Sequence, residues 1–168
     1  KLVNDAVIAA GDMQDGVKDG IIPDPRTVDF DPDDLVCGKA TNGACLSEAQ
    51  SQAVKALYGG PVTSQGIPTY HGGGLQPGSE LNWEAFLPLD GKRASADVSA
   101  SDTARYILTD WGPNWTFTDF DFDVDSRRII EMDRLYAASN PDLRDFKSAG
   151  GKLIMHQGWN DPMVVPLN

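Results

Sequence analysis

The sequence predicts a loop-rich α/β fold with short helices and few strands. Glycine and proline are frequent, at 17 and 11 of 168 residues, and a mean hydropathy of -0.33 indicates moderate apolar content. This composition favours long irregular segments. One apolar run, residues 153–155, leads into a polar loop that contains glycine. A buried strand of an open α/β sheet reaches a functional loop in this way.

Short helices are expected at five places, covering residues 2–10, 48–58, 101–108, 126–138 and 142–149. The second is the clearest, because Ser47 is a good N-cap and Gln50 completes a capping box. Glycines stop the first helix at Gly11 and the last at residues 150–151.

The segments between these helices are predicted to be loops. Residues 22–37 are crowded with proline and aspartate, and residues 59–79 form a long glycine-rich connection over a surface. Phenylalanine and aspartate alternate over residues 120–123, which is compatible with a short strand.

The charge of the chain restricts its partners. A formal net charge of -11 makes nucleic acid an unsuitable partner, because phosphate backbones are bound through lysine and arginine. The same acidity favours divalent cations. No apolar run reaches the roughly 18 residues of a membrane span, so no membrane partner is expected. The chain begins at Lys1 and ends soon after an apolar strand, so we expect further N- and C-terminal parts of the same chain.

The two cysteines, Cys37 and Cys45, enclose a short polar stretch. Such a spacing can close a small disulfide loop in an oxidising compartment. Two free thiols are the alternative. Two cysteines alone are too few ligands for a structural zinc site.

Residues 12–21, reading DMQDGVKDGI, form a candidate calcium loop. The carboxylates of Asp12, Asp15 and Asp19 lie within eight residues, and calcium takes about 6–8 oxygen ligands. Glycines after the second and third aspartates permit tight turns that aim the carbonyls of Val17 and Ile21 inward. The spacing does not match an EF-hand. A solvated acidic turn is the alternative from the residues alone.

Several motifs in order resemble the tannase and feruloyl esterase family, which also contains mono(2-hydroxyethyl) terephthalate hydrolases. The resemblance rests on the aspartate loop, the cysteine pair, the FDFD of residues 120–123 and the stretch NPDLRDFKSAGGKLIMHQGWNDP at residues 140–162. It implies an α/β-hydrolase core with a large inserted lid. Residues 1–138 would be the lid, with structural calcium at the aspartate loop, and residues 139–168 would return to the core.

The resemblance also implies a secreted or periplasmic serine esterase that acts on small aromatic esters of feruloyl, galloyl or terephthaloyl type. Such enzymes use a Ser-His-Asp triad. The triad acid corresponds to Asp161, whereas the serine and the histidine would lie outside this chain, which alone should be inactive. No Gly-x-Ser-x-Gly elbow is present. His156 is expected to pack at the end of the core strand, and His71 to lie in an exposed loop. Gln157 stands where the family often has histidine.

A non-catalytic function is the alternative hypothesis. The chain would then be a calcium-stabilised module that binds a ligand or partner through an aromatic cluster. The cluster consists of Trp111, Trp115, Phe117, Phe120 and Phe122. Aromatic clusters are more often core than binding site, so this cluster does not separate the two hypotheses.

Overall fold

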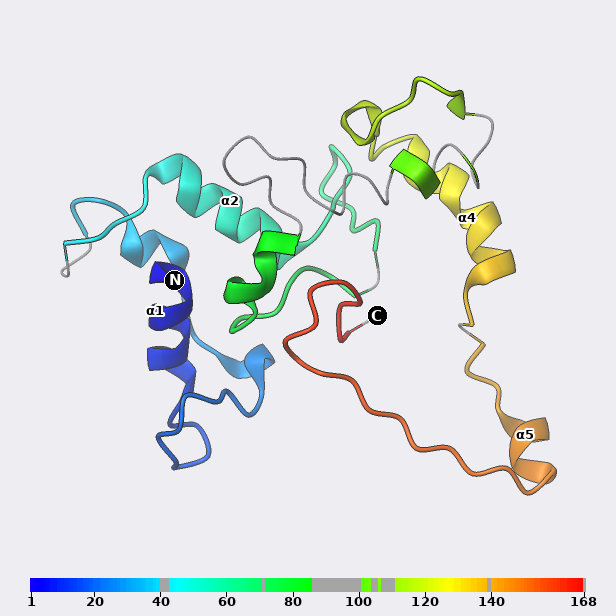
Figure 1. Ribbon diagram of the computed structural model, residues 1–168, viewed down its shortest axis with the longest axis horizontal. Coiled ribbons are helices and arrows are strands. Elements are labelled where there is room, and N and C mark those ends of the chain that lie inside the picture. The colour runs from blue at the N-terminus through cyan, green and yellow to red at the C-terminus, as the bar shows by residue number, and fades with distance from the viewer. Residues whose placement is uncertain are drawn as a thin grey trace.

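The computed structural model describes residues 1–39, 43–70, 72–85, 101–103, 106, 111–138 and 140–167 (Figure 1). The helices, in chain order, are α1 (Leu2–Gly11), η1 (Pro25–Thr27), η2 (Pro32–Leu35), α2 (Glu48–Gly59), η3 (Glu80–Ala85), η5 (Phe117–Asp119), α4 (Asp125–Tyr136) and α5 (Arg144–Ser148). Over these parts of the chain, β pairing is confined to two isolated bridges, Val36–Leu46 and Val62–Pro68. The prediction of a loop-rich chain with short helices and few strands is confirmed.

The N-terminal part of the chain forms a cluster of helices. Helix α1 contacts η3, and α2 contacts η2, as the blue, cyan and green ribbons of Figure 1 show. Val7, Val54 and Trp83 are its buried apolar side chains. Helices α4 and α5 lie apart from this cluster, and the chain after α5 runs back toward it (Figure 1). None of the helices described is both long and apolar enough to cross a membrane.

Helix α2 begins as its sequence predicts. The hydroxyl of Ser47 accepts a hydrogen bond from the backbone N–H of Gln50 at 3.2 Å, and the Gln50 side chain accepts one from the Ser47 N–H at 2.8 Å. This reciprocal capping box satisfies two amides that would otherwise lack partners at the helix start. The predicted helix at residues 48–58 is confirmed, with its end one residue later.

A buried carboxylate connects α1, α2 and η3. Glu80 Oε1 accepts hydrogen bonds from the hydroxyl of Tyr58 at 2.5 Å and the N–H of Gly78 at 2.8 Å. Its Oε2 accepts one from Asn4 Nδ2 at 2.8 Å. Burial, followed by the bond to Glu80, raises the pKa of Tyr58, so its hydroxyl stays protonated and donates. The bond from Asn4 joins two segments whose residues are 76 positions apart in sequence, and the bond from Tyr58 spans 22 positions.

Replacing Glu80 with glutamine is expected to lower the free energy of unfolding by about 2 kcal/mol, because an NH₂ group would then face donors that now meet a carboxylate. Urea denaturation of the variant and the parent measures the difference. Glu84→Gln, at an exposed position of the same helix, is the control and should change stability little. Equal effects of the two substitutions would contradict the structural role of Glu80.

The segment with alternating phenylalanine and aspartate does not form a strand, so that interpretation is wrong. Residues 117–119 form η5, and residues 122–124 form a turn. Asp121 Oδ1 accepts hydrogen bonds from the N–H groups of Asp123 at 2.8 Å and Val124 at 3.3 Å. Aspartate side chains that bind nearby amides compete with the ladder of a sheet, and here they prevail.

The later helices agree with the sequence in place but not in length. Helix α4 starts one residue before the predicted start and ends at Tyr136, and α5 is shorter than the predicted 142–149. The chain leaves α5 through Gly150, which has a φ of 81°, a conformation that favours glycine. Of the predicted helix at 101–108, residues 101–103 and 106 are helical, and the others lie outside the described residues.

The apolar run at residues 153–155 is neither paired nor buried, and its prediction as a buried strand is wrong. Leu153, Ile154 and Met155 are 55%, 92% and 83% exposed. His156 is also exposed, contrary to the expectation that it packs at a strand end. An extended segment buries its side chains only against neighbouring strands, and none adjoins it in the described residues. His71 lies outside the described residues.

Candidate active-site loop and aspartate loop

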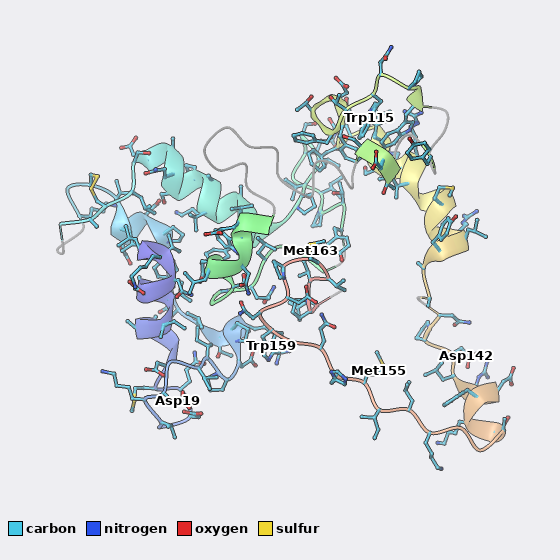
Figure 2. The ribbon with its side chains drawn as sticks, viewed as in Figure 1. Asp19, Trp115, Asp142, Met155, Trp159 and Met163 are labelled. Carbon is cyan, nitrogen blue, oxygen red and sulfur yellow. A yellow bond between two sulfur atoms is a disulfide. The ribbon has the colours of Figure 1, made fainter. Side chains whose placement is uncertain are left out.

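Asp161 lies in the acid loop, residues 157–164, which contains the labelled Trp159 and Met163 of Figure 2. Asp161 Oδ1 accepts hydrogen bonds from the N–H groups of Met163 at 2.8 Å and Val164 at 3.0 Å. Pro162 has no N–H, so these are the first two amides after the aspartate that can donate. The Asp161 N–H donates to the carbonyl of Gly158 at 3.2 Å. Local chemistry therefore sets the direction of this carboxylate.

The second oxygen of Asp161 meets Gln157. Gln157 Nε2 donates to Asp161 Oδ2 at 3.2 Å and to the carbonyl of Val164 at 2.9 Å. The amide thus joins the two ends of the loop and contacts the carboxylate directly. The sequence identified Gln157 only as a departure from the family motif, because the residue type does not indicate which of its neighbours it binds.

The environment of Asp161 keeps it ionised. The backbone amides of Val164 and Met163, in that order, hold its pKa below the ordinary value of 3.8, and Gln157 adds a smaller effect in the same direction. A partly exposed, oriented anion can accept a hydrogen bond from an imidazole and stabilise its charge. No histidine is hydrogen-bonded to Asp161 in the described residues.

The aspartate loop begins at the end of α1 and closes on Asp12. This buried side chain uses Oδ1 to accept hydrogen bonds from the N–H groups of Asp19 at 3.0 Å and Gly20 at 2.6 Å. Gly20 has a φ of 78°, so the turn at this position needs glycine. The loop is therefore folded back on itself by one carboxylate.

The other two carboxylates of the aspartate loop bind amides two residues further on. Asp15 Oδ1 accepts from Val17 N–H at 2.9 Å, and Asp19 Oδ1 accepts from Ile21 N–H at 3.0 Å. The donor set is of the oxygen type that calcium takes. In the parts of the chain that are described, however, no three His, Cys, Asp or Glu side chains converge as a metal site requires. The loop therefore fits calcium by donor chemistry, and gathering its carboxylates around one ion requires their side chains to turn.

Cys37 and Cys45 form a disulfide, which decides between the two alternatives left by the sequence. Backbone hydrogen bonds align the two segments next to it. Cys37 N–H donates to the carbonyl of Leu46 at 3.0 Å, and Leu46 N–H donates to that of Leu35 at 2.8 Å. The bridge therefore closes a loop whose two ends are already paired.

The aromatic side chains of residues 111–122 pack mainly against one another. The ring of Trp111 lies 4.5 Å from that of Trp115 and 5.8 Å from that of Phe120, between centroids, and Phe120 lies 4.9 Å from Phe122. The guanidinium of Arg128 lies 4.9 Å from the centroid of Trp111. Phe122 remains 45% exposed. The cluster is thus partly a small core and partly an open apolar surface.

Comparison with known proteins places the whole chain in one family. The family model described as tannase and feruloyl esterase matches residues 1–168. An uncharacterized esterase of Xanthomonas campestris pv. campestris is 30% identical, over 96% of this chain and 30% of its own length. The mono(2-hydroxyethyl) terephthalate hydrolase of Piscinibacter sakaiensis is 28% identical, over 99% of this chain and 34% of its own length.

A solved structure supports the same relationship. The crystal structure of feruloyl esterase B from Aspergillus oryzae has a TM-score of 0.72 and 29% identity, over 89% of this chain and 29% of the other. The described chain therefore has the fold of the corresponding part of that esterase. The chain spans only about three-tenths of the length of its relatives. It covers 30% of the Xanthomonas esterase and 31% of the probable feruloyl esterase B-2 of Aspergillus terreus. From its motifs, its fold and these matches, the chain belongs to the tannase and feruloyl esterase family.

Proposed function

We propose that this chain supplies the triad acid, Asp161, of a secreted serine esterase that hydrolyses carboxylic esters of aromatic acids. The observation that carries the proposal is the carboxylate of Asp161, which two backbone amides orient and keep ionised within the family's acid motif. The relatives include proteins named probable feruloyl esterase B-2 and mono(2-hydroxyethyl) terephthalate hydrolase. The nucleophilic serine and the histidine are proposed to lie outside these 168 residues.

The chemistry assigned to Asp161 is electrostatic and orienting. In a serine esterase the histidine removes the serine proton as the hydroxyl oxygen attacks the ester carbonyl, and later gives that proton to the leaving alcohol. An anionic aspartate bound to the other ring nitrogen selects the correct tautomer and stabilises the imidazolium. Asp161 is suited to this role because hydrogen bonds from the amides of Met163 and Val164 fix the orientation of its carboxylate.

The division of the chain between lid and core is part of the proposal. Residues 1–138 are assigned to an inserted lid and residues 139–168 to the core of an α/β-hydrolase. The exposed apolar run at residues 153–155 supports the second assignment, because such a segment matches a core strand that needs neighbouring strands. The disulfide supports a secreted or periplasmic location, since disulfides persist in oxidising compartments.

Calcium is proposed as a structural ion of the aspartate loop. Its ligands would be the carboxylates of Asp12, Asp15 and Asp19 and the carbonyls of Val17 and Ile21. A bound calcium would supply a positive charge that offsets the repulsion among three neighbouring carboxylates. The residues themselves already hold the loop closed through Asp12.

A non-catalytic binding module is the second candidate. The observation that favours it is the exposure of Phe117 and Phe122, at 46% and 45%, beside the packed tryptophans. Such a surface can accept an apolar ligand or partner. This candidate requires no activity from the full-length protein.

The experiment that tests the proposed function compares the 168-residue chain with the full-length protein that contains it. We expect the full-length protein to release product from methyl ferulate, methyl gallate or mono(2-hydroxyethyl) terephthalate. The 168-residue chain should show no turnover, because two triad members are missing. Turnover by the short chain that Asp161→Ala abolishes would contradict this division. An inactive full-length protein that binds aromatic acids would favour the module.

A further inference from the structure

Two contacts connect the acid loop to the N-terminal cluster. The guanidinium carbon of Arg26 lies 5.2 Å from the ring centroid of Trp159, which is two residues before Asp161. Asn82 Nδ2 donates a hydrogen bond to the carbonyl of Asn160 at 3.2 Å. Figure 2 shows Trp159 beside the N-terminal segments, whereas Met155 lies on the extended stretch away from them. Two consecutive residues of the acid loop are thus contacted by distant parts of the chain.

Arg26 is itself held in a defined position. Its Nε donates to Asp24 Oδ1 at 2.8 Å and its Nη2 donates to Asp24 Oδ2 at 2.6 Å. Asp24 Oδ1 also accepts from the Arg26 N–H at 3.1 Å, which caps the short helix η1. A guanidinium bound through two parallel hydrogen bonds presents a planar face in a fixed orientation. The side chain of Trp159 therefore meets a preorganised cationic plane.

The internal bonds of the acid loop do not place it relative to the rest of the molecule. They run among Gln157, Gly158, Asp161, Met163 and Val164, all within the loop. Residues 152–156, which precede the loop, are exposed. In the described residues, the loop has one ring contact and one hydrogen bond with residues before 140. Arg26 makes the ring contact, and Asn82 makes the hydrogen bond. Among the hydrogen bonds and ring contacts described, these two residues therefore link the acid loop to the N-terminal part of the chain.

We propose that Arg26 is a positioning residue of the esterase, which acts through Trp159 to place the loop of Asp161. The inference rests on the proposed role of Asp161. An acid that misses its histidine by even about 1 Å loses much of its effect, and such displacements can lower turnover by about 100-fold. The hydrogen bond from Asn82 also holds the acid loop in place. Removing Arg26 alone should therefore lower turnover by less than about 100-fold.

The test uses the full-length enzyme with Arg26→Ala, Arg26→Lys and Trp159→Leu. We expect Arg26→Ala and Trp159→Leu each to lower kcat by about tenfold, while KM changes less than about twofold. Lysine should recover only part of the activity, because it lacks the planar fork. Arg144→Ala is the matched control. Arg144 makes the same two-bond fork with Asp142 but has no ring contact with Trp159, so its loss should leave kcat unchanged.

Combining the substitutions separates positioning from general stability. If Arg26 acts through Asp161, then Arg26→Ala should cause no further loss of kcat in an Asp161→Asn background. It should also move the acidic limb of the kcat/KM profile to lower pH, because a displaced carboxylate no longer raises the pKa of the triad histidine. A melting temperature near that of the parent shows that the variant is folded. If Arg26→Ala does not fold, Trp159→Leu carries the same comparison.

The outcomes distinguish this inference from the proposed function. Full activity of Arg26→Ala and Trp159→Leu, with a large loss in Asp161→Asn, would overturn the positioning role and leave the triad acid in place. Independent multiplication of the Arg26 and Asp161 losses would overturn it as well. Full activity of Asp161→Asn would remove the proposed function and this inference together. A fall in kcat in Arg26→Ala that is absent in the Asp161→Asn background supports both the proposed function and the positioning role of Arg26.

Discussion

If Asp161 is the triad acid, replacing it with asparagine in the full-length protein is expected to lower kcat by about 10⁴-fold, the effect of an aspartate-to-asparagine change in a characterised Ser-His-Asp triad. The amide has nearly the same shape, but it carries no charge and offers an NH₂ group where an acceptor is needed. The histidine would then adopt the wrong tautomer, and its positive charge would lack a partner. Initial rates on an aromatic ester over a range of concentrations measure kcat and KM.

The control for this substitution is Asp145→Asn on α5. Asp145 is exposed and lies in the same C-terminal part of the chain, but its side chain has no contact with the acid loop among the hydrogen bonds described. Its replacement should leave kcat unchanged. A loss of less than about tenfold in Asp161→Asn would mean that another residue supplies the triad acid.

The lowered pKa of Asp161 determines how its contribution to the stability of the folded protein changes with pH. The amides of Val164 and Met163 lower this pKa in the folded protein below 3.8. The stabilisation that this gives is therefore fully present above the unfolded value and is lost as the pH falls through the folded one. We therefore expect the acidic limb of activity to report the triad histidine, whose ordinary pKa of about 6.5 the carboxylate of Asp161 would raise, and not Asp161 itself.

Calcium is expected to stabilise the folded protein, and the size of this effect depends on its concentration. A ligand that binds only the folded state adds about 2.7 kcal/mol at a hundredfold excess over its Kd. The full-length protein should therefore melt several degrees higher in excess calcium than in EDTA. Asp15→Ala should abolish most of this shift, whereas Asp29→Ala, at an exposed position outside the loop, should retain it.

Asp15 is a better test of the calcium site than Asp12. Asp12 is buried and binds the amides of Asp19 and Gly20, so its loss should lower stability even without calcium. The Asp15 carboxylate binds one amide at an exposed position, which limits this effect. Equal melting temperatures in calcium and EDTA for the parent protein would refute the site.

The candidate site could be predicted only in part. Asp161 was predicted as the triad acid from the family motif, and this role remains a prediction; the proline that follows it explains why its carboxylate reaches the amides of Met163 and Val164. The contact between Arg26 and Trp159 could not be predicted, because neither residue has a local pattern that indicates its partner. The ligand role of the aspartate loop remains a prediction.

What the sequence determined by itself is the structure that depends on near neighbours. Ser47 and Gln50 cap α2 across a few residues, and the aspartates near residue 121 choose turns over a strand through amides two and three positions away. Such bonds form wherever the local chain is placed. The residue pattern therefore sufficed to predict the cap of α2. At Asp121 the pattern suggested a strand, and the local bonds explain the turn only once the structure is known.

The tertiary structure alone decided what covers each segment. The apolar run at residues 153–155 has the composition of a buried strand, but in the described chain its side chains are exposed. A strand is buried only when other segments pack against it, and the sequence of the run does not indicate which segments do so. Arg26 and Trp159 meet because the chain returns to its N-terminal cluster after α5. Contacts between distant residues depend on the whole path of the chain, so no short stretch of sequence encodes them.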